Sequence, residues 1–178
     1  TRVSSAYFGE LPAVSLLTLT DDDLAAVQAV EEKIAAIGEV TLASKGAIEE
    51  AEAAYDALTE AQKQLVTNAD VLAAARESYD ELEAVKAVEE KIAAIGEVTL
   101  ASKGVIEEAE AAYDALTEAQ KSQVGNTDVL AAARASYNDL EAAKAVEEKI
   151  EAIGEVTLES KSAIDEANAA WKALNRTQ

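Results

Sequence analysis

Residues 69–95 read ADVLAAARESYDELEAVKAVEEKIAAI, and this stretch decides the fold. It contains neither glycine nor proline, and its apolar residues recur at steps of three and four, which is typical of one face of an α-helix. An additional step of three in the middle rotates the apolar stripe around the helix axis. We therefore predict one continuous helix whose two halves face different hydrophobic cores. The apolar positions are Leu72, Ala75, Tyr79, Leu82, Val85, Val88, Ile92 and Ile95.

The stretch belongs to a sequence that repeats with a fixed period. Val30, Val88 and Val146 each open the run VEEKI, and they follow one another at a spacing of 58 residues. Residues 30–87 and 88–145 differ at nine of 58 positions. A period of this size indicates a tandem array of one supersecondary unit. A second continuous helix is therefore expected at residues 127–153.

The chain is predicted to be all-α, with tandem three-helix-bundle repeats joined by continuous shared helices in an elongated rod. We divide it into residues 20–84 as the first repeat, 85–142 as the second and 143–178 as a partial third. A unit of this size buries only about 60% of its unfolded surface, so stacking on neighbours would stabilise it. The chain begins at Thr1 without an initiator methionine, and the third copy stops at Gln178. We therefore expect a piece of a longer protein.

Capping signals place the first two helices of a unit. Thr20 is followed by three aspartates, an arrangement that favours a helix start because the carboxylates complement the positive end of the helix dipole. Gly38 predicts the end of this helix in a left-handed conformation. Thr41 is expected to cap the second helix directly.

Further signals place the remaining helices. Thr59 and Gln62 have the spacing of a capping box, which predicts a short helix reaching about Val66. Asn68 or Asp70 is expected to cap the long helix that follows. In the third copy Asn175-Arg176-Thr177 replaces the Thr-Glu-Ala of this capping box, which disfavours the short helix there.

The first 19 residues, TRVSSAYFGELPAVSLLTL, do not follow the repeat. Pro12 and the serine and threonine content argue against a helix. A non-repeat lead-in or linker is one interpretation. The alternatives are the last strand of a preceding β-rich domain and a segment packed along the first bundle.

The composition limits the classes of partner. The net charge is −20, which disfavours nucleic acid and anionic membrane as partners because both require a basic patch. A solubilising role for this acidity, which also keeps an extended molecule extended, is the simpler interpretation; a surface for a basic partner is the alternative. There is no cysteine and no histidine. No apolar run is long enough to span a membrane, so membrane insertion is not expected.

No catalytic, cofactor-binding or metal-binding residue is predicted. Nucleophilic or general-base catalysis by histidine or cysteine is excluded because the chain contains neither. Adjacent carboxylates such as Glu31 and Glu32 diverge by about 100° on a helix, so they are interpreted as solvated faces rather than an acid–base pair. The aspartates 21–23 lack the spacing of a calcium loop and are interpreted as capping residues.

Aromatic residues recur at seam positions of the repeat, and we interpret them as core residues rather than as a stacking platform. They are Tyr55, Tyr79, Tyr113, Tyr137 and Trp171.

Two motifs carry a resemblance to a known kind of repeat. The run IGEVTLASK at residues 37–45, followed by AYDALT at 54–59, resembles the helical repeats of about sixty residues in large secreted or wall-anchored proteins of Gram-positive bacteria. These repeats are FIVAR-like, and spectrin-like in shape. The resemblance covers residues 20–178, although Trp171 replaces the tyrosine of the motif in the third copy. It implies an extracellular location, either secreted or anchored to the cell wall.

Two functions fit these observations. The first is a non-catalytic, monomeric structural stalk or spacer whose partners are neighbouring domains of the same chain. The second is an adhesin-type binding module for a host protein or glycan. Four of the nine differences between the two full copies, at positions 64, 65, 67 and 69 of the first copy, fall around the short helix and the cap that follows it, which fits tolerated change in connecting segments. The stalk is therefore the favoured prediction.

Overall fold

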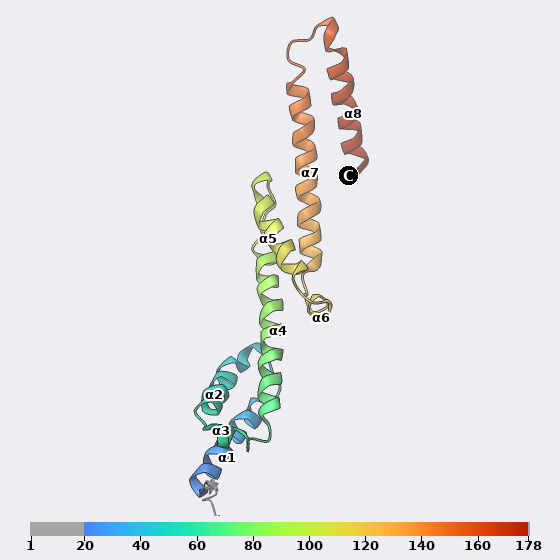
Figure 1. Cartoon of the computed structure of the whole chain (residues 1–178). Helices are drawn as coiled ribbons and strands as arrows, with labels where there is room; N and C mark the ends of the chain where they lie inside the picture. Colours follow the sequence, from blue (N-terminus) through green and yellow to red (C-terminus); the bar gives the residue numbers. More distant parts are fainter. Residues whose placement is uncertain (1–19, 178) are drawn as a thin grey trace, which may run out of the picture. The chain divides into compact units, whose positions relative to one another are not determined.

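The computed structural model describes residues 20–177, and within this range the protein is built from α-helices and short 3-10 turns (Figure 1). No strand occurs among these residues, so the predicted all-α class is confirmed. The predicted lead-in of residues 1–19 lies outside the described residues. The α-helices are α1 (Asp21–Ile37), α2 (Lys45–Asp56), α3 (Glu60–Lys63), α4 (Ala69–Ala93), α5 (Lys103–Asp114), α6 (Glu118–Lys121), α7 (Thr127–Glu151) and α8 (Lys161–Thr177).

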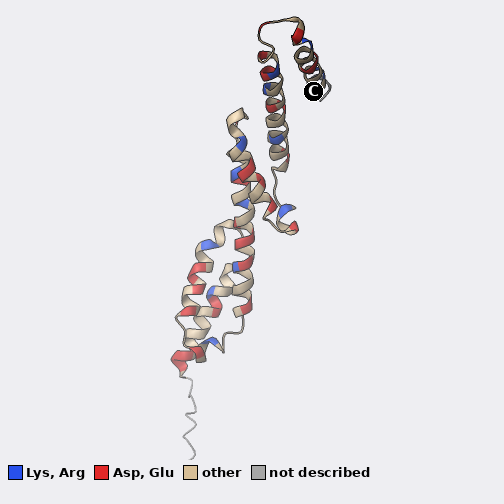
Figure 2. Ribbon diagram, turned by 45° about the horizontal axis from the view of Figure 1, so that its top comes forward, with Lys and Arg blue, Asp and Glu red and all other residues tan. Residues whose placement is uncertain are grey.

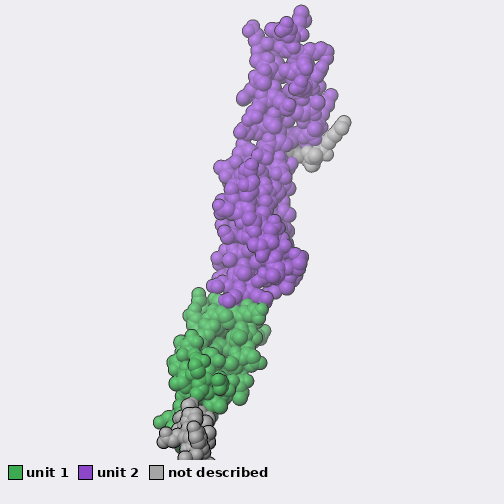
Figure 3. Space-filling view, in the orientation of Figure 1, with its two compact units in different colours: residues 1–79 green, residues 80–178 purple. Residues whose placement is uncertain are grey.

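The chain divides into two compact units, with the boundary between Tyr79 and Asp80 (Figure 3). This boundary lies inside α4, so one helix contributes to both units. The predicted continuous helices are confirmed, because α4 and α7 each run for 25 residues without a break and end two residues before the predicted positions.

Unit 1 has one hydrophobic core. Helices α1 and α2 pack against each other, and α3 lies on α1. The N-terminal half of α4 completes the core with Leu72, Ala75 and Tyr79. The fully buried side chains at its centre are Ile34 and Ile48.

Unit 2 repeats this core with the C-terminal half of α4, α5 and the N-terminal half of α7. Val85, Val88 and Ile92 of α4 pack here, while Leu130, Ala133 and Tyr137 of α7 take the places that Leu72, Ala75 and Tyr79 have in unit 1. The two halves of α4 therefore bury different faces in different cores, as the rotated stripe predicts. Unit 2 also contains α8, which packs against α7.

The first helix begins and ends as predicted, with one correction. The Thr20 side chain accepts a hydrogen bond from the Asp23 amide, and the Asp23 carboxylate accepts one from the Thr20 amide. Gly38 has a positive φ of 62°, but its ψ of −137° is not that of the left-handed helix. This region is open almost only to glycine, so the stop signal is correct although the expected conformation is not.

Thr41 caps a 3-10 turn (Leu42–Ser44) rather than α2 itself. The Ser44 hydroxyl accepts a hydrogen bond from the Thr41 amide at 3.0 Å, and the Ala43 amide donates to the Thr41 hydroxyl at 3.3 Å. These contacts close a turn of three residues before the α-helical pattern begins at Lys45.

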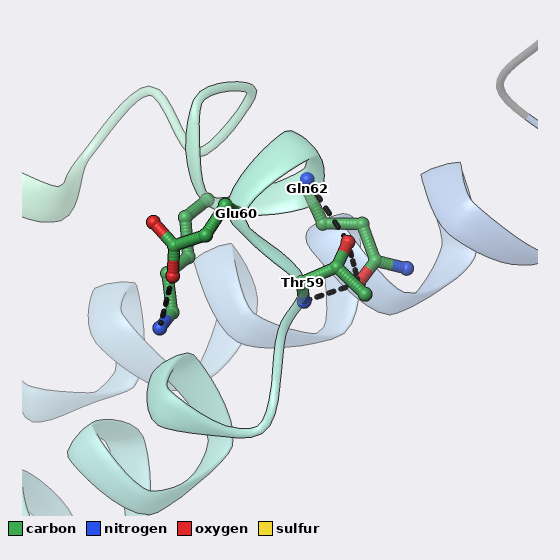
Figure 4. Close-up of polar contacts among 4 residues, drawn as sticks. Thr59, Glu60 and Gln62 are labelled. Carbon is green, nitrogen blue, oxygen red and sulfur yellow. Dashed lines mark hydrogen bonds and ion pairs between the residues drawn. The ribbon is translucent and has the colours of Figure 1, made fainter. Parts of the chain in front are cut away.

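The capping box of the short helix is confirmed (Figure 4). The Thr59 amide donates to Gln62 Oε1 at 2.8 Å, and the Gln62 amide donates to Thr59 Oγ1 at 3.4 Å. The α-helix ends at Lys63, so it is shorter than the predicted reach to Val66.

The third copy departs from this pattern. At the position where α2 ends, α8 continues as one helix to Thr177. Asn175 replaces the capping-box threonine there, so the threonine that starts a separate short helix in the full copies is missing. Helix α8 thus includes residues 176 and 177, the positions at which a helix equivalent to α3 would begin.

Candidate functional site

The acidic residues are distributed along the helices (Figure 2). Between residues 20 and 177 no group of three or more histidine, cysteine, aspartate or glutamate side chains could hold a metal ion. No described helix is long and apolar enough to cross a bilayer. The polar contacts that join the helices form the candidate site.

A glutamate near the middle of the unit's first helix forms one such contact. The Glu31 carboxylate accepts hydrogen bonds from the Thr67 hydroxyl at 2.6 Å and from the Thr67 amide at 2.7 Å. These bonds hold the pKa of Glu31 below its ordinary value. In unit 2 the Glu89 carboxylate accepts a bond from the Gly125 amide at 2.8 Å. The Glu31 carboxylate lies on an exposed face of α1, and from there it also fastens the segment that precedes α4.

The asparagine before each long helix reinforces this contact. Asn68 Nδ2 donates to the Glu31 carbonyl oxygen at 3.0 Å, and Asn126 Nδ2 donates to the Glu89 carbonyl oxygen at the same distance. The Asn126 side chain makes no capping hydrogen bond to its own helix. Asn68 Oδ1 accepts no hydrogen bond, so the prediction of Asn68 as a helix cap is corrected: its amide group reaches across to α1 instead.

An arginine–glutamate pair joins α2 to α4 in unit 1 and α5 to α7 in unit 2. Arg76 on α4 binds Glu52 on α2 through two parallel hydrogen bonds, with Nε–Oε1 at 2.7 Å and Nη2–Oε2 at 2.5 Å. Arg134 and Glu110 repeat the pair in unit 2 with the same distances. Such bidentate contacts attract the two side chains and also fix their relative orientation. The third copy has Asn168 at the position of these glutamates.

Acid should loosen these arginine–glutamate pairs. The hydrogen bond from Arg76 lowers the pKa of Glu52, and that from Arg134 lowers the pKa of Glu110. A lowered folded-state pKa adds stability that is complete above the unfolded value of about 4.3 and is lost as the pH falls through the folded value. Because the side chains are about one-third exposed, we expect only about 0.5–1 kcal/mol from each pair.

The measurement is urea unfolding between pH 7 and pH 2.5 for the parent chain and for the double variant Glu52→Gln, Glu110→Gln. The variant should be less stable than the parent at pH 7, and the two curves should converge at low pH. The other carboxylates titrate in both proteins, so their effect nearly cancels in the difference. A gap that stays constant over the whole range would contradict the assigned role of the pairs.

The seam aromatics divide into three groups. Tyr79 and Tyr137 are buried, each with an arginine guanidinium 5.8 Å from the ring centre. Tyr55 and Tyr113 are half-buried beneath Lys63 and Lys121. Trp171 is 52% exposed, so its interpretation as a core residue is wrong for the described structure. Periodicity assigns this side chain to a face of α8 but does not say what covers that face.

The comparisons with known proteins add no assignment. No protein-family model matches the chain, and neither a curated protein nor a solved structure gives a match. The resemblance to Gram-positive surface repeats therefore stays a prediction from the two motifs.

Proposed function

We propose that the chain is a non-catalytic structural stalk or spacer of a large secreted or cell-surface bacterial protein. The observation that supports this most directly is α4, an unbroken helix that places Tyr79 in one core and Val85 in the next. A loop between units would act as a hinge, whereas a helix of 25 residues is about 38 Å of stiff connection. Continuous helical connections of this kind suit a spacer that must hold its neighbouring domains apart.

The repeated polar contacts support the same proposal. The arginine–glutamate pair and the asparagine–carbonyl bond recur in both full copies, and each joins a long helix to a different neighbour. These contacts set the position of the long helix in its core. In this proposal the residues of the arginine–glutamate pairs and of the asparagine–carbonyl bonds have a structural role and take no part in catalysis.

In this proposal residues 20–84, 85–142 and 143–178 are successive three-helix repeats of an elongated, monomeric rod. The net charge of −20 favours this form, because like charges along a chain resist collapse and self-association. The proposed partners are the neighbouring domains of the same polypeptide. The proposed location is outside the cell.

Deletion of one period tests the proposal. Removing residues 30–87 joins Ala29 to Val88 and takes out 58 residues from a 58-residue period, so every apolar position keeps its neighbours. The shortened chain should stay helical, and small-angle scattering should show a shorter maximum dimension with an unchanged cross-section. A profile of a compact globule for either chain would overturn the rod.

The same deletion separates a stalk from a binding array. A stalk that is shortened loses reach, while an array of binding modules loses avidity, by as much as 10²–10⁴-fold where several sites act together. The measurement is attachment of the purified chain to Gram-positive cell wall, mucin glycans and host extracellular-matrix proteins. Binding that falls steeply with each deleted copy would replace the stalk by an adhesin.

A further inference from the structure

A groove on unit 2 lies between α5 and the N-terminal half of α7. Its volume of about 400 Å³ falls within the range of about 300–1,000 Å³ that is usual for small-molecule sites. The core beneath it belongs to a complete repeat, because α4, α5 and α7 all contribute side chains to it. The residues that line the groove are Glu110, Tyr113, Thr127, Leu130, Ala131 and Arg134.

One part of the groove is apolar. Leu130 and Ala131 supply aliphatic surface from α7, and the Tyr113 ring supplies aromatic surface from α5. Tyr113 is held in place, because it packs against the core of unit 2 and because Lys121 Nζ lies 5.7 Å from the centre of its ring. The groove therefore offers a ligand an apolar surface that is already formed before binding.

The other part of the groove carries polar groups with hydrogen-bonding capacity to spare. Thr127 and Tyr113 are half-buried, and their hydroxyls form no hydrogen bond within residues 20–177. Arg134 binds the Glu110 carboxylate through Nε and Nη2, which leaves the two N–H donors of its Nη1 group for a ligand. Each Glu110 oxygen accepts one of these bonds and can accept another. Donors and acceptors thus lie together beside the apolar surface.

The charges of the groove select the class of ligand. The Arg134–Glu110 pair is neutral as a whole. An anion would compete with Glu110 for the guanidinium and would be repelled by a chain of net charge −20. A cation would compete with Arg134 for the carboxylate. A neutral ligand with several hydroxyls leaves the pair intact, since each hydroxyl both donates and accepts hydrogen bonds.

We propose that this groove is a binding site for a neutral sugar in its pyranose ring form. The C–H groups on one face of the sugar ring pack on Tyr113 and Leu130. The hydroxyls at the edge of the ring accept hydrogen bonds from Arg134 and Thr127 and donate to Glu110. The inference goes beyond the spacer function and does not rest on it, because the groove lies within one unit whatever distance the chain maintains.

The first copy provides a comparison within the chain. Five of the six lining residues are identical at the equivalent positions, and the exception is Ala69 in place of Thr127. This is one of the nine positions at which the two full copies differ. Because Ala69 lacks the hydroxyl, we expect the sugar to bind unit 1 more weakly than unit 2.

Amide chemical shifts of the full chain measure binding. The probe is methyl β-D-glucopyranoside, and the control is sorbitol, which has the hydroxyls but no ring. The sugar should shift the amides of Gly125 and Thr127, which are distinct from their counterparts Thr67 and Ala69. The shifts should saturate at millimolar concentrations, because a small ligand makes few contacts. Shifts that rise linearly with sugar concentration, or that sorbitol reproduces, would overturn the proposal.

Two reciprocal variants test the role of the hydroxyl. Thr127→Ala should weaken binding at unit 2 by about five-fold, because one neutral hydrogen bond is lost. Ala69→Thr should strengthen binding at unit 1 by a similar factor, and circular dichroism should show that both variants keep the parental fold. A Thr127→Ala chain that binds the sugar as tightly as the parent would overturn the site. An Ala69→Thr chain without a gain at unit 1 would contradict the role of the hydroxyl.

Charged sugars test the class of ligand. Glucuronate is anionic and glucosamine is cationic at pH 6, and each should shift the Gly125 and Thr127 amides less than the neutral sugar does at the same concentration. A stronger response to glucuronate would assign the groove to an anion, and a stronger response to glucosamine would assign it to a cation. Either result would overturn the proposal.

Discussion

Replacing Ala84 with proline should lower the free energy of unfolding by about 3 kcal/mol or more and separate the unfolding of the two units. Residue 84 lies inside α4, between the half that packs in unit 1 and the half that packs in unit 2. Proline removes a backbone hydrogen bond at this point, and its ring clashes with the carbonyl four residues earlier. Each core keeps its side chains, but the helix that the two cores share is interrupted.

The measurement is thermal and urea unfolding followed by circular dichroism, with hydrogen exchange to assign the transitions to units. Ala84→Gly is the matched control, because it keeps the backbone hydrogen bond and costs only about 1 kcal/mol. The glycine variant should therefore keep the cooperativity of the parent. An unchanged midpoint and a single transition in the proline variant would show that α4 does not couple the units.

Truncating equivalent isoleucines should have very unequal effects. Ile106→Ala should cost about 2–5 kcal/mol, because Ile106 is fully buried in the core of unit 2 and its truncation leaves a cavity. Ile164→Ala should cost less than about 1 kcal/mol, because 38% of Ile164 is exposed and less apolar surface is lost. The two residues occupy the same position in α5 and α8, so helix propensity cancels in the comparison.

Urea unfolding of the full chain measures the stability lost in Ile106→Ala. Hydrogen exchange of the α8 amides measures the stability lost in Ile164→Ala. Equal losses at the two positions would contradict the partial exposure of Ile164.

Much of the fold could be predicted from the sequence, because its signals are local. The absence of glycine and proline, the three- and four-residue steps and the capping threonines all act within one or two helical turns. The extra step of three correctly predicted that Tyr79 and Val85 pack in different cores. The cap at Thr41 was less predictable, since the choice between a 3-10 turn and an α-helix depends on the serine hydroxyl of Ser44.

The contacts that join the helices could not be predicted in this way. Glu31 and Thr67 are 36 residues apart, and Arg76 and Glu52 are 24 apart. No periodicity relates these residues within one unit, so their partners appear only when the helices are packed. The same limit explains Asn68, whose type suits a helix cap but whose amide binds the carbonyl of Glu31.

The sharing of α4 between two cores has a mechanical consequence. When a chain is pulled from its ends, modules joined by loops can give way one at a time, and each releases its length separately. Here a stretched α4 would withdraw Tyr79 from one core and Val85 from the other in the same event. Adjacent units should therefore yield together under load, at a higher force and with a longer release of chain than a single unit would give.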